Sequence, residues 1–69
     1  MDMFILFGKD IYEEVEKNSL GIFPTFEKAK EAARACVEKY YDGDFSQVTF
    51  EVEHWEWNQF FGETILDLS

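Results

Sequence analysis

Positive charge is missing from the second half of this chain. Residues 40–69 contain seven acidic residues and no lysine or arginine, whereas residues 1–39 contain eight acids and six bases, and the net charge is −9. An acidic surface of this kind repels nucleic acids and anionic membranes and attracts basic surfaces. The composition therefore argues against direct binding to nucleic acid or membrane. It leaves open a basic protein partner, or charge that serves solubility alone.

Cysteine and long apolar runs are also scarce. The single cysteine, Cys36, excludes an internal disulfide and a cysteine-based zinc site, and it favours a reducing, cytoplasmic setting. The apolar run at residues 3–7 is only five residues long, and no basic segment precedes it. It is too short for a transmembrane helix and lacks the basic start of a signal peptide. We therefore expect a cytoplasmic protein.

Aromatic residues are abundant instead. Eight Phe, three Tyr and two Trp occur among 69 residues, a length that predicts a single domain over residues 1–69. A domain of this size buries only about 60% of the surface that its unfolded chain exposes. Large rings bury much apolar area each, so they compensate for the small core.

Apolar periodicity predicts an α+β domain in which one helix packs on a small antiparallel sheet of three to four strands, in the order β-β-α-β with a final hairpin. Strands are expected over residues 3–7, 20–23, 47–57 and 64–68, a turn within 58–63, and a helix over 26–41. Residues 10–16 alternate weakly; they extend the first strand past a bulge at Gly8 or form a ribbon arm. Thr25 is the expected N-cap, and Asp42-Gly43-Asp44 the turn that ends the helix.

The predicted helix has an inner face of mainly small residues. Its apolar positions recur at helical spacing: Ala29, Ala32, Ala33, Cys36, Val37 and Tyr40. Such a face lets the helix sit close to a sheet with bulky side chains. Cys36 falls on this stripe, so it is expected to be a small core residue rather than a nucleophile.

Residues 20–32, LGIFPTFEKAKEA, resemble the middle of many small, largely uncharacterised phage and bacterial domains. In these a strand ending in Leu-Gly-Val/Ile-Phe/Tyr runs through Ser/Thr into a Glu-x-Ala-rich helix, and a later strand carries Glu, Trp and Tyr, as residues 52–56 do here with Glu and Trp. The resemblance covers about two-thirds of the chain. It implies a ββαβ fold and a phage or bacterial origin, but no activity. Residues 11–16 and Phe60-Phe61 depart from the pattern.

Metal and catalytic chemistry find little support. Glu51, Glu53, His54 and Glu56 stand within six residues, but a strand would project His54 and Glu56 from one face and the other two from the opposite face. Asp42-Gly43-Asp44 resembles part of a calcium loop whose remaining ligands are missing. His54 is expected at the end of the core face, and there is no glycine-rich phosphate loop. We therefore expect no metal, no cofactor and no enzymatic activity.

Two placements of the tryptophans are open. Unbroken alternation puts Trp55 and Trp57 on the solvent side with Glu51 and Glu53. A bulge near Glu53-His54 would reverse the register and bury both indoles with Phe50.

These features favour a small, non-catalytic binding protein that occupies a basic surface on another protein by imitating nucleic acid. By size and charge the chain is similar to phage-encoded inhibitors of bacterial defence, such as anti-CRISPR or anti-restriction proteins, which act on nucleases and other nucleic-acid-binding proteins in the host cytoplasm. The predicted contacts are Glu51, Glu53, Trp55, Glu56 and Trp57, with Asp42, Asp44, Glu63 and Asp67 as steering charges. The alternatives are an assembly module that forms a homodimer through its aromatic strand, and an immunity-type protein that neutralises a basic toxin.

Overall fold

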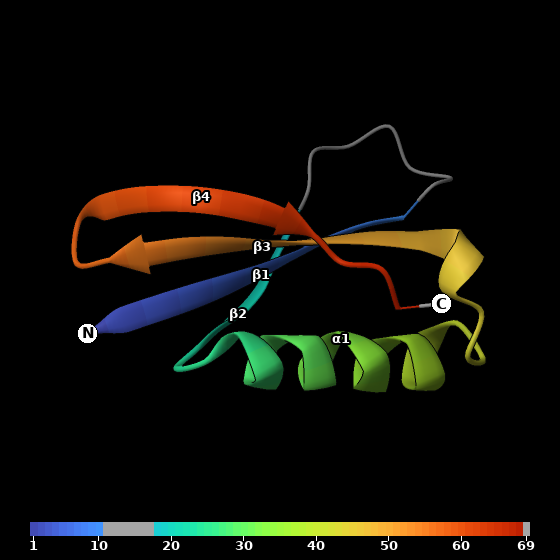
Figure 1. Cartoon of the computed structure of the whole chain (residues 1–69). Helices are drawn as coiled ribbons and strands as arrows, with labels where there is room; N and C mark the ends of the chain where they lie inside the picture. Colours follow the sequence, from blue (N-terminus) through green and yellow to red (C-terminus); the bar gives the residue numbers. More distant parts are fainter. Residues whose placement is uncertain (11–17, 69) are drawn as a thin grey trace.

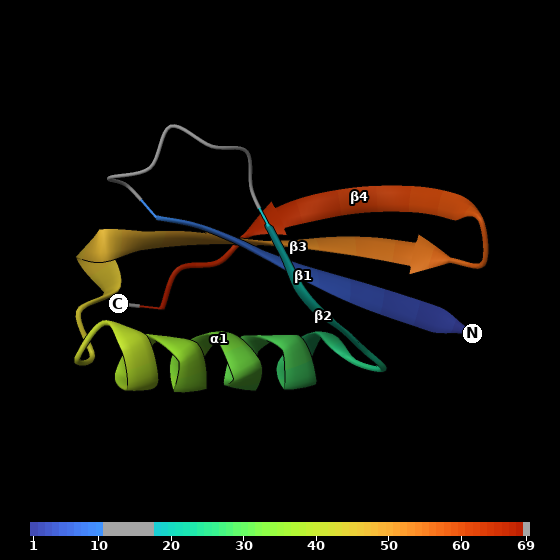
Figure 2. The same cartoon turned by 180° about the vertical axis from the view of Figure 1, so that it is seen from behind.

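Four strands form one antiparallel sheet in the order β2-β1-β3-β4, and one helix lies against one of its faces (Figures 1 and 2). The computed structural model describes residues 1–10 and 18–68. Its elements are β1 (Asp2–Asp10), β2 (Asn18–Phe23), α1 (Phe26–Tyr40), the short 3₁₀ turn η1 (Phe45–Gln47), β3 (Val48–Glu56) and β4 (Gln59–Ile65). This confirms the predicted α+β fold, with the final hairpin present.

The two central strands, β1 and β3, pair along their whole length, from Asp2 opposite Glu56 to Asp10 opposite Val48. The expected bulge at Gly8 is wrong, because β1 runs through this glycine, and the shift in its pairing with β2 falls between Leu6 and Phe7. A Cβ at Gly8 would approach Leu20 Cδ1 to 2.9 Å, so glycine lets the bulky neighbours close over the strand. The predicted extension of this strand, or ribbon arm, over residues 10–16 lies outside the described residues from Ile11 on.

Helix α1 begins at Phe26, as predicted, and ends at Tyr40, one residue before the predicted end. The Thr25 hydroxyl accepts a hydrogen bond from the Lys28 backbone N–H at 3.1 Å, which satisfies a free donor of the first turn. At the other end, Gly43 takes a left-handed φ of 79° and donates its N–H to the Val37 carbonyl at 3.1 Å. The described part of the chain contains no helix that is long and apolar enough to cross a membrane.

The core lies between α1 and the sheet. Among the described residues, the buried ones that form it are Leu6, Ala29, Ala33, Val37, Val48, Phe50 and Val52. Cys36 is half-buried and packs against this cluster, and burial raises the pKa of its thiol above the ordinary value. The helix therefore contributes small side chains and the sheet large ones, as the apolar stripe predicts; Tyr40, the last residue of the predicted stripe, is instead 69% exposed.

The C-terminal hairpin differs from the prediction. The chain turns at Trp57-Asn58, and β4 runs over Gln59–Ile65, whereas the expected turn was at 58–63 and the expected strand at 64–68. A two-residue turn suffices because Trp57 adopts a positive φ of 54°. Beyond β4 the pairing with β3 continues for one residue, because the Leu66 N–H donates to the Phe50 carbonyl at 2.9 Å.

Candidate binding surface on the outer face of the sheet

The face of the sheet turned away from α1, here called the outer face, carries apolar and acidic side chains together. Strand pairing defines it, because directly opposed residues project to the same side. Met3, Ile5 and Phe7 of β1 oppose Trp55, Glu53 and Glu51 of β3. The outer face comprises Met3, Ile5, Phe7, Lys9, Ser19, Ile22, Thr49, Glu51, Glu53, Trp55, Phe60, Glu63 and Ile65. Ile22 and Ile65 are 62% and 71% exposed, so much apolar surface remains in contact with water.

Three carboxylates converge on this face. Glu51, Glu53 and Glu63 each place a carboxylate oxygen within 4.8 Å of the other two. Glu63 was predicted only as a steering charge; its position opposite Glu53 in the β3–β4 pairing brings it into the cluster. The hairpin register is the signal that would have found it. The cluster concentrates negative potential suited to a lysine or arginine side chain, and its oxygens are also of the type that bind hard divalent cations.

Trp55 borders this cluster. Its indole N–H donates to Glu53 Oε1 at 2.9 Å, and its ring lies 5.3 Å from that of Phe60 at an interplanar angle of 59°. The side chain is half-buried on the outer face, as unbroken alternation predicts. The extra residue in the pairing is Phe61 on β4, since the register passes from His54–Gly62 to Trp55–Phe60. The alternative, in which a bulge in β3 buries both indoles, is therefore wrong.

Trp57 is separated from Trp55. β3 ends at Glu56, so Trp57 lies in the turn and does not share the outer face, contrary to the alternation prediction. It is 72% exposed. Glu56, the last residue of the strand, is also exposed and opposes Asp2. The predicted contacts thus divide between the outer face and the tip of the β3–β4 hairpin.

Comparison with known protein families gives a match that covers most of the chain. Residues 1–62 match the family described as "Domain of unknown function (DUF7336)". The chain belongs to this family. No curated protein and no solved structure matches it. The match extends from the start of β1 into β4, and the description of the DUF7336 family assigns it no activity.

His54 supports the hairpin from the α1 side of the sheet. Its ring stacks on Phe4, with centroids 4.5 Å apart and planes 5° apart, and on Phe61 at 5.2 Å. Its Nε2 lies 2.9 Å from Asp2 Oδ1. The imidazole is thus packed and hydrogen-bonded at the end of the core face, as predicted. These contacts join β1, β3 and β4 directly behind Trp55.

The remaining predicted charges of the DUF7336 domain lie elsewhere. Asp42 and Asp44 precede η1, at the opposite end of β3 from Trp57. The Asp44 carboxylate caps η1, accepting from the Ser46 hydroxyl at 2.6 Å, the Gln47 amide at 2.9 Å and the Ser46 N–H at 3.0 Å. These bonds, that of the Ser46 hydroxyl foremost, hold the pKa of Asp44 below its ordinary value. Asp44 therefore has a structural role.

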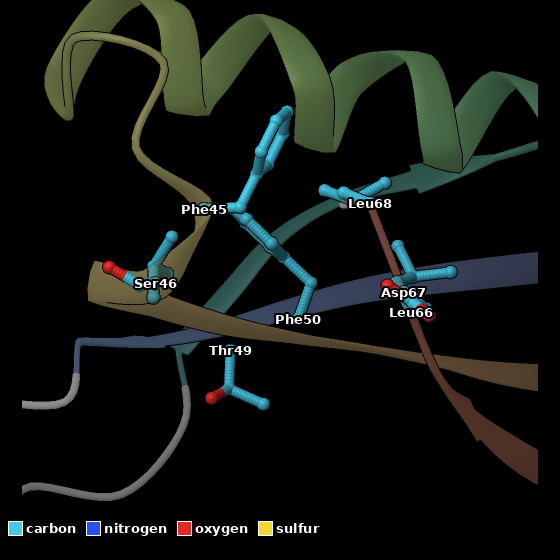
Figure 3. A pocket seen from close by; sticks show the side chains of 8 residues that line it. Phe45, Ser46, Thr49, Phe50, Leu66, Asp67 and Leu68 are labelled. Carbon is cyan, nitrogen blue, oxygen red and sulfur yellow. The ribbon is translucent and has the colours of Figure 1, made fainter.

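A hollow of about 380 Å³ lies at this same end, between η1 and the C-terminal tail (Figure 3). Phe45, Val48, Phe50, Leu66 and Leu68 form its apolar wall, and Asp67 is the acidic residue that lines it. Two smaller hollows, of about 280 and 210 Å³, both lie beside Leu20 and Cys36. The three carboxylates of the outer face line none of these three hollows.

The described basic residues lie mostly in the helical layer. Lys28, Lys30, Arg34 and Lys39 belong to α1, on the other side of the sheet from the carboxylate cluster (Figure 1). Lys28 pairs with Glu31 of the same helix at 3.8 Å. Lys9 of β1 lies opposite Thr49, so it projects from the outer face itself, towards the end of β3 away from Trp55. The four helical bases thus lie on the other side of the sheet from the clustered acids, and Lys9 is the described base on the side of the acids.

Proposed function

We propose that this DUF7336 domain is a small, non-catalytic binding protein that docks its outer face on a basic surface of another protein. One observation carries the proposal: three carboxylates meet within 4.8 Å beside Trp55, on the face opposite the helical bases. Residues 40–69, the part of the sequence that supplies all three, contain seven acidic residues and no lysine or arginine. Such a surface attracts and orients a basic partner before contact is made.

The apolar residues give this face more than long-range attraction. Clustered carboxylates alone supply on-rate and orientation, because exposed ion pairs contribute little net binding energy. Trp55 and Phe60 lie against each other beside the acids and can be desolvated when a partner closes over them. Aromatic residues of this kind dominate the energy of many interfaces. Acids and rings together suit a surface whose lysines and arginines normally hold nucleic acid.

The partner class follows from the same chemistry. We propose that the domain is a phage-encoded inhibitor that covers the nucleic-acid-binding surface of a host defence protein, such as a nuclease, in the host cytoplasm. Support comes from its size, its charge and the resemblance of residues 20–32 to small phage and bacterial domains. An immunity-type protein against a basic toxin would use the same surface, and the genes beside this one distinguish the two.

Charge reversal on the outer face tests the proposal. The triple variant Glu51→Lys, Glu53→Lys and Glu63→Lys is titrated, by fluorescence anisotropy of labelled protein, against purified host nucleases with and without competing DNA. We expect the wild type to bind at least one nuclease in competition with DNA, and to weaken steeply with added salt. The triple variant should bind at least about 100-fold more weakly, since like charges replace complementary ones.

A matched control separates this surface from net charge. Glu27→Lys, Glu31→Lys and Glu38→Lys together make the same change of charge on α1, in the other layer. This control should retain most of the binding. Equal losses in both triple variants would show that net charge alone acts, and unchanged binding by the outer-face variant, with the fold intact by circular dichroism, would reject the proposal.

Self-association is a second candidate, favoured by the edge strand β4. One side of β4 pairs with β3, and its Phe60, Phe61 and Ile65 are 47%, 51% and 71% exposed. Exposed edge strands can pair with another chain. Light scattering at high salt tests this candidate: a dimer that persists at 1 M salt and is lost in Ile65→Lys would support it, and a monomer would reject it.

A further inference from the structure

Trp57 occupies a backbone position that disfavours tryptophan. Among the described non-glycine residues, a positive φ occurs at Asp42 and Trp57. Aspartate tolerates this conformation, whereas a bulky side chain there is strained. Trp57 is also the first central residue of a two-residue hairpin turn, a place where glycine is preferred in type II′ turns. A Gly-Asn turn would form this hairpin with less strain than Trp57-Asn58.

Packing of the Trp57 side chain does little to offset this backbone strain. The side chain of Trp57 is 72% exposed, whereas Trp55 is half-buried and bonded to Glu53. A strained backbone that the surrounding structure does not explain is found mainly at functional positions. Figure 1 shows that the turn holding Trp57 ends the β3–β4 hairpin, at the same end of the sheet as the N-terminus. The hairpin therefore presents a large ring at its tip.

The charges around this tip indicate what it meets. Glu56 directly precedes Trp57, and the rest of residues 53–63 adds Glu53 and Glu63 of the outer-face cluster and no lysine or arginine. Anionic lipid surfaces would repel such a tip. A second copy of the chain carries the same charge of −9 and is disfavoured for the same reason. A protein pocket with an apolar interior and a rim of lysine or arginine fits both the ring and the acids.

We propose that Trp57 is the anchor of the interface, inserting into an apolar pocket with a basic rim on the partner protein. This inference rests on the proposed function, and it adds a second contact to that of the outer face. Tryptophan anchors in desolvated pockets carry a large share of binding energy. Removing the ring should weaken binding at least about 30-fold, in the range of interface hot spots, while the fold stays intact because the ring is mainly exposed.

The first test needs no partner. Trp57→Gly and Trp57→Asn both suit a positive φ, so the thermal midpoint of each full-length variant should equal or exceed that of the wild type. A thermal midpoint lowered by more than about 5 °C in both variants is the shift expected when a small domain loses a stabilising packing contact. This result would overturn the proposal. It would show that Trp57 is retained for folding.

The second test uses a defined probe: a display library of a small folded scaffold with one randomised concave surface, selected on the full-length wild-type protein. We expect the recovered scaffolds to be rich in lysine and arginine, and to bind Trp57→Gly at least about 30-fold more weakly. Tyr40→Ala is the matched control, because Tyr40 is a comparably exposed ring (69%) in the helical layer. It should bind as the wild type does.

The outcomes separate the two proposals. Scaffolds that bind the outer-face triple variant weakly but bind Trp57→Gly normally would overturn the anchor and leave the proposed function standing. Scaffolds indifferent to both the triple variant and Trp57→Gly would overturn both. Binding of the wild type to anionic vesicles, or a dimer by light scattering that Trp57→Gly abolishes, would also overturn the anchor in a foreign basic pocket.

Discussion

Enlarging Ala33 tests whether the helix depends on small residues to sit close to the sheet. Ala33 is 0% exposed, between Ala29 and Val37 on the inner stripe of α1, and both neighbours are also 0% exposed. In Ala33→Leu, three extra carbon atoms would have to enter this interface. None of the three hollows described above is lined by Ala33, so the added volume has to displace neighbouring core side chains.

Overpacking of this kind costs about 1–3 kcal/mol. A chain of 69 residues has a total stability of about 3–10 kcal/mol, at roughly 0.05–0.15 kcal/mol per residue. Ala33→Leu should therefore remove a substantial fraction of the free energy of unfolding. The difference in helix propensity adds little to the change in the free energy of unfolding, because leucine is nearly as good a helix former as alanine.

Urea unfolding followed by tryptophan fluorescence and by circular dichroism measures the effect. Ala35→Leu is the matched control, because Ala35 is an exposed position of the same helix. Its free energy of unfolding should stay within about 0.5 kcal/mol of the wild type. Equal stability of the Ala33 and Ala35 variants would refute the close packing of α1 on the sheet.

Two further predictions concern stability. Because the folded state lowers the pKa of Asp44, its ionised carboxylate stabilises the fold above the ordinary aspartate range, and this contribution is lost as the pH falls through the lowered value. Asp44→Ala should thus lower the thermal midpoint at pH 7, and the gap should shrink below about pH 4; a constant gap would contradict the capping role. His54→Ala removes the stack on Phe4 and should cost about 1–2 kcal/mol in urea unfolding. Asp2→Asn should cost less than about 1 kcal/mol, because an exposed polar contact such as that between Asp2 and His54 contributes little; the reverse order would show that the contact with Asp2 dominates.

Local patterns were sufficient for the elements that are set by near neighbours. The spacing of Ala29, Ala33 and Val37 predicts the buried face of α1, and Thr25 predicts its N-cap, because helix contacts lie within four residues. Alternation likewise places Trp55 on the outer face. The C-terminal hairpin was misjudged, because glycine and asparagine suggested a wider turn. A tryptophan with positive φ is not a turn signal that a sequence displays.

By itself, then, the sequence determined the fold class, the helix with its small inner face, and the acidity of residues 40–69. Only the tertiary structure decided that Glu63 joins Glu51 and Glu53, that α1 holds its bases on the other side of the sheet, and that Trp57 stands alone at the hairpin tip. The reason is physical. Periodicity records which face of an element is buried, whereas the grouping of charges depends on strand register and on the place where the chain turns, and these follow from long-range pairing.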